Sequence, residues 1–428
     1  MIWTKQTAVA YSLLLVLAVL WVSSLVPLAQ AEPPAPPSAA WDQWRGPTRD
    51  GRVPPGADWP ATIDEATLRL LWRVPLDKGY SSPIVTADRV YTVETEANKR
   101  EVVRAFERAT GKEVWNTNWT GAMRVPFFAR SRGSWIRCTP SHSGDALYVG
   151  GMRDVLACID ADSGAERWRV DFMARHTSKL PKFGFASSPL VTADGVYAQA
   201  GGSVVKLDPR NGKSLWRTLD DGGGMWHSAF SSPMPAVLCG KPQLVVQTRT
   251  VLAGVDLDSG KVLWSVDVPA FRGMNILNPT VIGNQVFTSS YGGGSFLFEI
   301  ILDQDKWSVR EVWKNGIEGY MSSPIVLGGH IYLHRRDRRF CCLEWGTGLE
   351  KWKTQKRFGG YWSMVTDGKR ILALDQKGEL LLIRPDPEKF VLLGRRKVSD
   401  QQTWAHLAVI DGFLFIRELK GITAWSWQ

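Results

Sequence analysis

From about residue 80 onward the chain repeats one pattern of apolar strands and polar turns. Short apolar runs follow small residues, as in SSPIVTADRVYTV from Ser81, SSPLVTADGVYAQA from Ser187 and SSPIVLGGHIYLH from Ser322. The Asp-Arg, Asp-Gly and Gly-Gly pairs inside these runs favour tight hairpin turns, because such residues adopt positive φ at low cost. The pattern predicts short strands joined by turns, and no stretch after the N-terminal segment has a convincing helical period.

A second motif ends most repeats with a turn and a tryptophan. DLDSGKVLW ends at Trp264, and near-copies end at Trp115, Trp168, Trp216 and Trp352, with a degraded copy at Trp313 and a fainter one at Leu392. The copies recur at roughly 40 to 53 residues, a period typical of propeller blades and solenoid units. We interpret the Ser/Thr/Asn-Gly pair as the turn before an outermost strand. The tryptophan on that strand is expected to pack on the neighbouring blade and to donate its indole N–H to a backbone carbonyl.

The number of repeats predicts an all-β fold, a single eight-bladed β-propeller of four-stranded blades. The last repeat reaches Gln428 after three strands, and residues 68–76 can supply the fourth, which closes the ring without an open edge. Seven blades are the alternative if the region from Trp362 onward is irregular. The repeats start near Ser81, Thr139, Ser187, Ser231, Asn278, Ser322, Trp362 and Trp404. The predicted docking tryptophans are Trp72, Trp115, Trp168, Trp216, Trp264, Trp313 and Trp352.

The first 67 residues differ in composition from the repeats. Residues 1–31 combine a short basic start, an apolar run and the small-residue site Ala29-Gln30-Ala31, which is typical of a secretory signal peptide. Cleavage near Ala31 predicts a periplasmic or secreted protein, although the apolar run is long enough to remain as a membrane anchor. Residues 32–67 are expected to form a proline-rich tether and N-terminal extension, and residues 68–428 the propeller.

The net charge of the chain indicates which partners to expect. The net charge of +10 on an exported protein favours a protein or an anionic envelope polymer as partner, with peripheral envelope association. Nucleic acid is disfavoured because export removes the protein from most of it. We expect a monomer.

The cysteine count limits the possible disulfides. Five cysteines leave at least one thiol unpaired if all disulfides are internal, and the pairing stays open among Cys138, Cys158, Cys239, Cys341 and Cys342.

The turn motif also resembles a known family signature. ACIDADSGAERW (157–168) and AGVDLDSGKVLW (253–264) approach the tryptophan-docking pattern A-x-D-x-x-[TS]-G-x-x-x-W with the Asp displaced by one position, and KLDPRNGKSLW (206–216) matches it in part. Over most of residues 68–428 the chain therefore resembles the quinoprotein-like, PQQ-type β-propeller repeat family. That family includes quinone-dependent dehydrogenases and non-enzymatic members similar to the outer-membrane-protein assembly factor of the BamB type. The opening WDQWRGPTRDG (41–51) also resembles the start of secreted bacterial propellers of this family.

For an enzymatic member, the resemblance implies PQQ on the propeller axis with calcium, a catalytic Asp, and often a disulfide between adjacent cysteines. Cys341 and Cys342 are adjacent, but we place them in a third strand, where successive side chains point to opposite faces. No group of Asp, Glu and Asn residues suggests a calcium site. We therefore expect no catalytic residue, no metal ligand and no cofactor, with PQQ and calcium as the alternative.

The long loops suggest a binding face. In a propeller, the loops from fourth to first strands and the turns from second to third strands open on the same side. The loops at 116–135, 171–185 and 220–230 are rich in basic and aromatic residues, as are several second-to-third turns. Such a surface is typical of binding sites, although the aromatics could instead fill the channel. The candidates are Arg124, Arg130, Arg132, Trp135, Trp226, His227, Tyr291, Tyr320, Arg335, Arg336, Arg338, Trp362 and Trp404.

Three functions are compatible with these features. The first is an exported binding or scaffold protein that acts through the basic, aromatic face. The second is a PQQ-dependent quinoprotein oxidoreductase, and the third is an outer-membrane protein assembly factor. The sequence favours the first, a non-enzymatic role.

Overall fold

A computed structural model describes residues 40–56, 58–221 and 229–427. The chain divides into two units, Met1–Pro37 and Ser38–Gln428, and the described residues belong to the second. The predictions for a signal peptide and for the start of the tether lie outside the described residues. In the part that is described, no helix is both long and apolar enough to cross a membrane.

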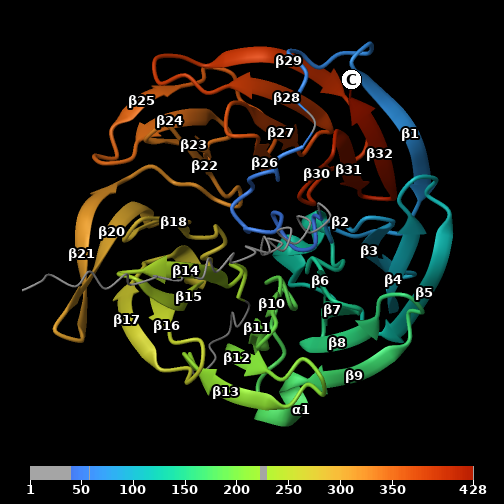
Figure 1. Ribbon diagram of the computed structural model, residues 1–428, viewed down its shortest axis with the longest axis horizontal. Helices are drawn as coiled ribbons and strands as arrows, with labels where there is room; N and C mark the ends of the chain where they lie inside the picture. The colour runs from blue at the N-terminus through green and yellow to red at the C-terminus, as the bar shows by residue number, and fades with distance from the viewer. Residues whose placement is uncertain (1–39, 57, 222–228, 428) are drawn as a thin grey trace, which may run out of the picture. The chain divides into compact units, whose positions relative to one another are not determined.

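The second unit is a ring of eight four-stranded antiparallel sheets, which confirms the all-β, eight-bladed propeller (Figure 1). Blade 1 contains β2 (Ile84–Val85), β3 (Arg89–Glu96), β4 (Arg100–Glu107) and β5 (Glu113–Thr120). Blade 2 contains β6 (Ser141–Ser143), β7 (Ala146–Gly151), β8 (Val155–Asp160) and β9 (Glu166–Asp171). Blade 3 contains β10 (Leu190–Thr192), β11 (Gly195–Ala200), β12 (Ser203–Leu207) and β13 (Ser214–Thr218). Blade 4 contains β14 (Met234–Leu238), β15 (Lys241–Gln247), β16 (Val251–Val255) and β17 (Val262–Asp267).

The remaining four blades complete the ring. Blade 5 contains β18 (Thr280–Ile282), β19 (Gln285–Ser290), β20 (Gly294–Asp303) and β21 (Lys306–Asn315). Blade 6 contains β22 (Ile325–Leu327), β23 (His330–His334), β24 (Phe340–Glu344) and β25 (Glu350–Lys353). Blade 7 contains β26 (Trp362–Thr366), β27 (Ile371–Asp375), β28 (Glu379–Arg384) and β29 (Val391–Lys397), and blade 8 contains β30 (Ala408–Ile410), β31 (Phe413–Glu418), β32 (Gly421–Trp427) and β1 (Leu68–Pro75). Short helices occur only in loops of the described chain: η1 (Phe127–Arg132), α1 (Phe172–His176) and η2 (Phe271–Gly273).

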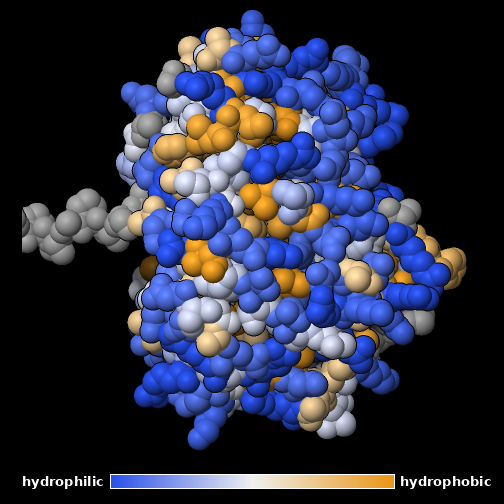
Figure 2. Space-filling model, turned by 90° about the vertical axis from the view of Figure 1, so that its right-hand side faces the viewer, coloured by the Kyte–Doolittle hydropathy of each residue, from blue (hydrophilic) through white to orange (hydrophobic). Residues whose placement is uncertain are grey.

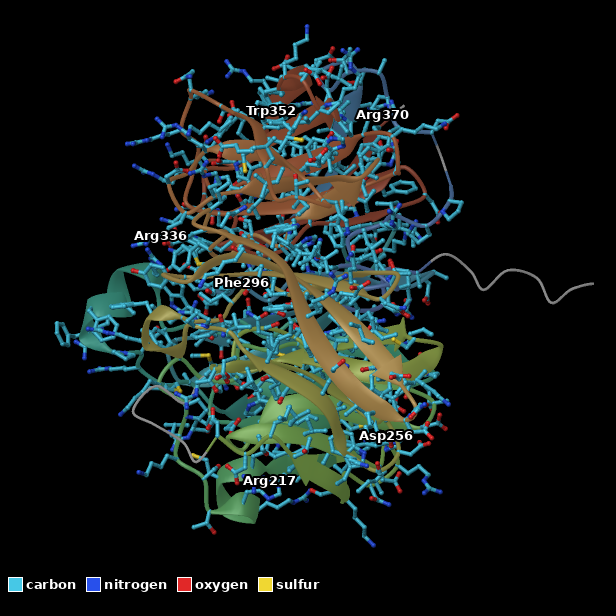
Figure 3. The ribbon with its side chains drawn as sticks, turned by 90° about the vertical axis from the view of Figure 1, so that its left-hand side faces the viewer. Arg217, Asp256, Phe296, Arg336, Trp352 and Arg370 are labelled. Carbon is cyan, nitrogen blue, oxygen red and sulfur yellow. The ribbon has the colours of Figure 1, made fainter. Side chains whose placement is uncertain are left out.

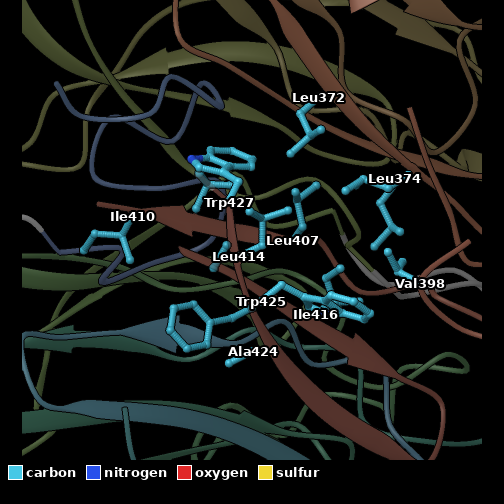
Figure 4. Close-up of a cluster of buried hydrophobic side chains, with 14 of the residues drawn as sticks. Leu372, Leu374, Val398, Leu407, Ile410, Leu414, Ile416, Ala424, Trp425 and Trp427 are labelled. Carbon is cyan, nitrogen blue, oxygen red and sulfur yellow. The ribbon is translucent and has the colours of Figure 1, made fainter. Parts of the chain in front are cut away.

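Closure of the ring joins the two ends of the propeller. Strand β1 pairs with β32 in an antiparallel register from Leu68 opposite Trp427 to Pro75 opposite Gly421. Blade 7 is complete, so the seven-bladed alternative is excluded. Blades 7 and 8 share an apolar cluster in which side chains such as Leu372, Leu374 and Leu414 pack together (Figure 4).

The tryptophans on the outer strands connect neighbouring blades. Trp115 Nε1 donates to the carbonyl of Ala161 in the next blade at 3.0 Å. Its ring lies against the turn glycine Gly164, whose φ is +75°. Equivalent indole-to-carbonyl bonds join Trp72 to Arg108, Trp168 to Pro209, Trp216 to Leu257, Trp313 to Trp345 and Trp352 to Asp386.

Trp264 differs from the other docking tryptophans because its Nε1 donates to Gln243 Oε1, within its own blade, at 2.6 Å. The neighbouring blade 5 has a longer outer hairpin that turns at Gln304 and Asp305, where both residues adopt positive φ, in place of the short Ser/Thr/Asn-Gly turn. The change of turn therefore removes the usual docking position for Trp264.

The small residues that start each repeat form a closed ring of hydrogen bonds around the axis. A backbone N–H at the start of one blade donates to a side-chain oxygen at the start of a neighbour, over distances of 2.7 to 3.3 Å. We call this ring the axial belt. Its bonds run from Ser82 to Thr139, Thr139 to Ser188, Ser188 to Ser232, Ser232 to Asn278, Asn278 to Ser323, Trp362 to Ser322, Leu407 to Ser363 and His406 to Ser82.

Residues 41–53 form an axial strap that crosses the centre of the ring (Figure 1). Trp41 pairs with Val85 of blade 1, and the fully buried Arg49 donates to the carbonyls of Ser188 and Pro189 in blade 3. The equally buried Arg45 donates to Pro324 of blade 6 at 2.8 Å. Burial lowers the pKa of Arg45 to about 10 and that of Arg49 to about 9.

Substitution of Gly164 tests the contact between tryptophan and turn. A Cβ at Gly164 would lie 2.6 Å from the Trp115 ring, whereas a Cβ at Gly144 of the same blade, with φ of +63°, would have no neighbour within 4 Å. We expect Gly144→Ala to cost about 1 kcal/mol through backbone strain alone. Gly164→Ala should cost a further 1–3 kcal/mol, roughly, through overpacking. Urea unfolding measures both, and equal costs would contradict the docking role.

Acid should destabilise the propeller through His406. Burial, with a contribution from the nearby Arg45, lowers the pKa of His406 from 6.5 to about 3. Below pH 6.5 the unfolded chain therefore binds a proton that the folded chain does not, and stability falls with pH. At pH 5 this loss is about 2 kcal/mol. Between pH 7 and pH 5, His406→Gln should lose about 2 kcal/mol less unfolding free energy than the parent. Identical losses would mean that His406 is protonated in the fold.

Candidate functional site

The loops that open on one side of the ring build the candidate site. These are the connections from each outermost strand to the innermost strand of the next blade, together with the turns between second and third strands. Figure 3 shows Arg336, from a second-to-third turn, at one side of the molecule and Asp256 and Arg370 at the other. We call the side with Arg336 the loop face.

Each of the eight loops from one blade to the next contributes an aromatic side chain to a single axial cavity. The cavity has a volume of about 470 Å³. Every loop starts from the outer strand and returns to the axial belt, so each has a segment that passes close to the centre of the ring. We call these side chains the aromatic collar: Tyr80, Phe128, Phe183, Phe230, Phe271, Tyr320, Tyr361 and Trp404.

Rings of the collar contact one another and form two continuous walls. Trp404 stacks on Tyr361 with centroids 5.7 Å apart and also contacts Tyr80 at 6.0 Å. On the other side, Tyr291 joins the collar through Tyr320 at 4.9 Å and Phe271 at 5.2 Å. Buried or half-buried aromatic pairs of this kind are rigid and contribute beyond their buried area. The collar is thus a preformed wall.

Arginines are the charged side chains among the residues that line the cavity, which include no Asp or Glu. Arg132, Arg137 and Arg272 belong to this lining. Arg132 Nη1 donates to the Tyr320 hydroxyl at 3.0 Å, and Arg137 lies over the Tyr80 ring at 5.5 Å. Guanidinium groups on aromatic faces keep their N–H edges directed toward other acceptors.

Two of these guanidinium groups have no carboxylate partner. Among the described residues, neither Arg132 nor Arg137 forms an ion pair, and Arg137 Nε has no hydrogen-bond acceptor. Burial, together with the like charge of Arg132, lowers the pKa of Arg137. Positive charge in a partly desolvated cavity is costly without a counter-charge. The cavity is therefore electrostatically suited to an anion.

A second cavity of about 480 Å³ adjoins the first on the side of blades 5 to 7. It shares Arg132, Tyr320 and Trp404 with the axial cavity and adds Arg336 and Arg338. Arg336 lies 4.1 Å above the Tyr291 ring and pairs with Glu318 at 2.9 Å. The two cavities therefore form one elongated depression with basic groups along its length.

The floor of the axial cavity is polar. Ser82, Thr139, Ser188, Ser232 and Asn278 of the axial belt line it, together with Trp44 and His406. The side-chain oxygens of these belt residues already accept hydrogen bonds from the belt. The belt thus fixes the shape of the floor.

Most of the predicted face residues lie on the loop face, but they are not equivalent. Arg132, Tyr291, Tyr320 and Trp404 line the axial cavity, and Arg336 and Arg338 line its neighbour. Arg124 and Arg130 are exposed on the loop after β5. Trp135 is half-buried against Tyr80, with ring centroids 5.4 Å apart. Arg335 pairs with Glu350 and Asp337, and Trp226 and His227 lie outside the described residues.

The assignment of Trp362 to the binding face was wrong. Its side chain is fully buried in β26 and donates to Asp375 Oδ2 at 2.8 Å. It packs between His334 and Phe358, at 5.0 and 4.5 Å between ring centroids. The last aromatic residue of this loop is one position earlier, at Tyr361, and that side chain enters the cavity.

Sequence reasoning also missed part of the site. Tyr80, Phe230, Phe271 and Arg137 were not among the predicted face residues, although all line the cavity. A signal was present, since Tyr80 and Phe230 stand directly before the small residues that start a repeat, and Tyr320 stands two residues before Ser322. An aromatic residue at that position marks the end of a loop that returns to the axis.

The residues that line the cavity do not fit a calcium ion. Calcium is bound by several oxygen ligands that usually include carboxylates, and the lining has no Asp or Glu. Within the described ranges, no group of three or more His, Cys, Asp or Glu residues could hold a metal ion. Cys341 and Cys342 are buried in separate clusters on opposite faces of β24, and all five cysteines are free thiols.

Comparisons with known proteins agree with this architecture. The outer membrane protein assembly factor BamB of Moranella endobia is 23% identical over 346 residues, which cover 72% of this chain and 81% of the relative. The crystal structure of BamB from Moraxella catarrhalis superimposes with a TM-score of 0.60 at 16% identity and covers 84% of this chain and 98% of that one. A quinohemoprotein alcohol dehydrogenase from Pseudomonas putida shares the fold, with a TM-score of 0.57 at 13% identity over 91% of this chain and 80% of that one. Residues 99–354, more than half of the chain, match one family, and the chain therefore belongs to the family described as outer membrane protein assembly factor BamB.

Proposed function

We propose that the protein is a non-catalytic scaffold of the cell envelope that takes part in outer-membrane protein assembly. In this role it binds a protein partner at the rim of the loop face. Support comes from its membership of the BamB family and from the surface of the rim. Export to the envelope, which the N-terminal segment predicts, is part of the same proposal.

The observation that carries the proposal is an exposed apolar and basic projection at the rim. The side chain of Phe127 in η1 is 78% exposed and that of Phe128 is 48% exposed, beside the exposed Arg130. Phe271, on the loop after β17, is 48% exposed as well. Aromatic residues and arginine are enriched in protein–protein interfaces, whereas large exposed aromatics are unfavourable on an isolated surface.

The side of the ring that Figure 2 shows is less suited to such a role. It is mostly hydrophilic, with hydrophobic side chains in separate patches. Scattered hydrophobic residues are normal on protein surfaces and do not indicate an interface. The rim therefore remains the stronger candidate for the partner.

Chemical groups at the axis also favour binding over catalysis. The titratable side chains that line the axial cavity are tyrosines, arginines and His406. Burial raises the pKa of Tyr80 to about 12 and keeps His406 neutral, with a pKa of about 3. Neither Tyr80 nor His406 is therefore adjusted to exchange protons near pH 7.

Substitution of the two η1 phenylalanines tests the proposal. The chromosomal gene is deleted in the native host and complemented with the parent or with Phe127→Ser/Phe128→Ser. Folded outer-membrane β-barrel proteins are then quantified by heat-modifiable gel mobility. Deletion should lower their amount, and the double variant should restore less than half of the loss, because the apolar anchors for the partner are removed.

The matched control is Val237→Ser/Leu349→Ser. Its side chains, which are 61% and 60% exposed, belong to β14 and to the turn before β25, away from the rim. This variant should restore β-barrel amounts to the parent level. If deletion of the gene leaves these amounts unchanged, the role in assembly is refuted; if both double variants restore them fully, η1 is not the docking site.

A further inference from the structure

We propose that the axial cavity and its neighbour bind an acidic oligosaccharide, with its carboxylates on the arginines and its sugar rings on the aromatic collar. This site lies inside the collar and includes Phe128 and Phe271, whereas the rim proposed to hold a protein is centred on Phe127, which lines neither cavity. The inference therefore goes beyond the assembly role and does not depend on it.

The charge of the site selects an anion. Arg132 and Arg137 line the axial cavity without a carboxylate partner among the described residues, and no acidic residue lines either cavity. Arg338, in the neighbouring cavity, is exposed and also forms no ion pair within the described chain. Arginine binds carboxylates through two parallel N–H groups, and such bonds are strong where water is partly excluded.

The walls of the site select a ring-shaped ligand rich in hydroxyl groups. The negative face of an aromatic ring attracts weakly positive C–H groups, which a sugar ring presents on its flat sides. Trp404 and Tyr320 line both cavities and are the rings that would present such faces. The hydroxyls of Tyr291 and Tyr320 and the amides of Gln376 and Gln402 are placed to bond sugar hydroxyls.

The size and shape of the site favour an oligomer over a single small anion. The two cavities, of about 470 and 480 Å³, share one wall, and each is in the range of ordinary ligand pockets. Basic groups occur in both, from Arg137 in the first to Arg338 in the second. A chain with one carboxylate on each sugar unit matches charges distributed in this way.

A flexible acidic peptide fits the same charges less well. Peptide side chains would pair with the arginines, but a peptide presents few flat faces to a collar built from every loop of the ring. It would also lose more conformational freedom on binding than a stiff sugar chain. The peptide is therefore the competing ligand that the experiment must separate from the sugar.

Isothermal titration calorimetry of the full-length mature protein tests the proposal with three probes. These are trigalacturonate, the neutral maltotriose and a hexa-aspartate peptide. Trigalacturonate should bind saturably and more weakly as salt rises, because its carboxylates pair with arginines. Maltotriose and hexa-aspartate should each bind at least tenfold more weakly.

Two substitutions locate the site. Arg132→Gln should weaken trigalacturonate binding at least tenfold, because it removes a cationic group shared by both cavities. Arg395→Gln is the matched control, since this arginine lies on β29 of the outer wall with a side chain that is 57% exposed. It should leave the dissociation constant unchanged. Thermal unfolding checks that both variants are folded.

Several results would overturn the proposal. Absence of saturable trigalacturonate binding, or equal binding of maltotriose, would remove the acidic sugar as ligand. Tighter binding of hexa-aspartate would assign the site to an acidic peptide. Equal weakening by Arg132→Gln and Arg395→Gln would reduce the interaction to general charge attraction. None of these results would affect the assembly role, which is measured through the rim variants.

Discussion

Closure of the ring is the constraint on which the rest of this structure depends. Two sets of bonds enforce it at different radii: the pairing of β1 with β32, and the axial belt of small polar residues around the centre. The belt works because each serine, threonine or asparagine accepts a hydrogen bond from the blade beside it. A backbone N–H near the axis would otherwise be buried without an acceptor, which costs more than the bond contributes. With eight blades, every junction between neighbouring blades has its hydrogen bond in the belt.

The site is a consequence of that closure. Each loop from one blade to the next must end at the belt, so a side chain just before the belt is directed to the axis whatever the length of its loop. The loop after β5 and the loop after β1 differ greatly in length, yet Arg137 and Tyr80, each two positions before a belt residue, reach the same cavity. The axial strap closes the centre with Arg45 and Arg49, which are bound to backbone carbonyls. The polar floor and the aromatic wall therefore have separate structural origins.

The lining of the axial cavity has arginines and no carboxylates. Buried carboxylates are engaged within the blades, as with Asp375, which accepts from Trp362, and Glu101, which accepts from Trp119. Burial raises the pKa of Glu101 to about 7. The cavity itself is left to arginines and tyrosines. The loops rather than the blades therefore set the charge of the cavity.

Local chemistry in the sequence determined the blades. Turn residues such as Gly164 and the Asp160 carboxylate that accepts from Ser163 act within a few positions, so strands, turns and the tryptophan on the outer strand could be predicted from short segments. The contacts that bring side chains to the axis depend on residues far apart in the sequence. Arg49 meets Pro189 across 140 positions, Trp362 turns inward while its neighbour Tyr361 enters the cavity, and Trp264 loses its partner because of a hairpin in another blade. These contacts exist only once the ring has closed, and the tertiary structure alone decided them.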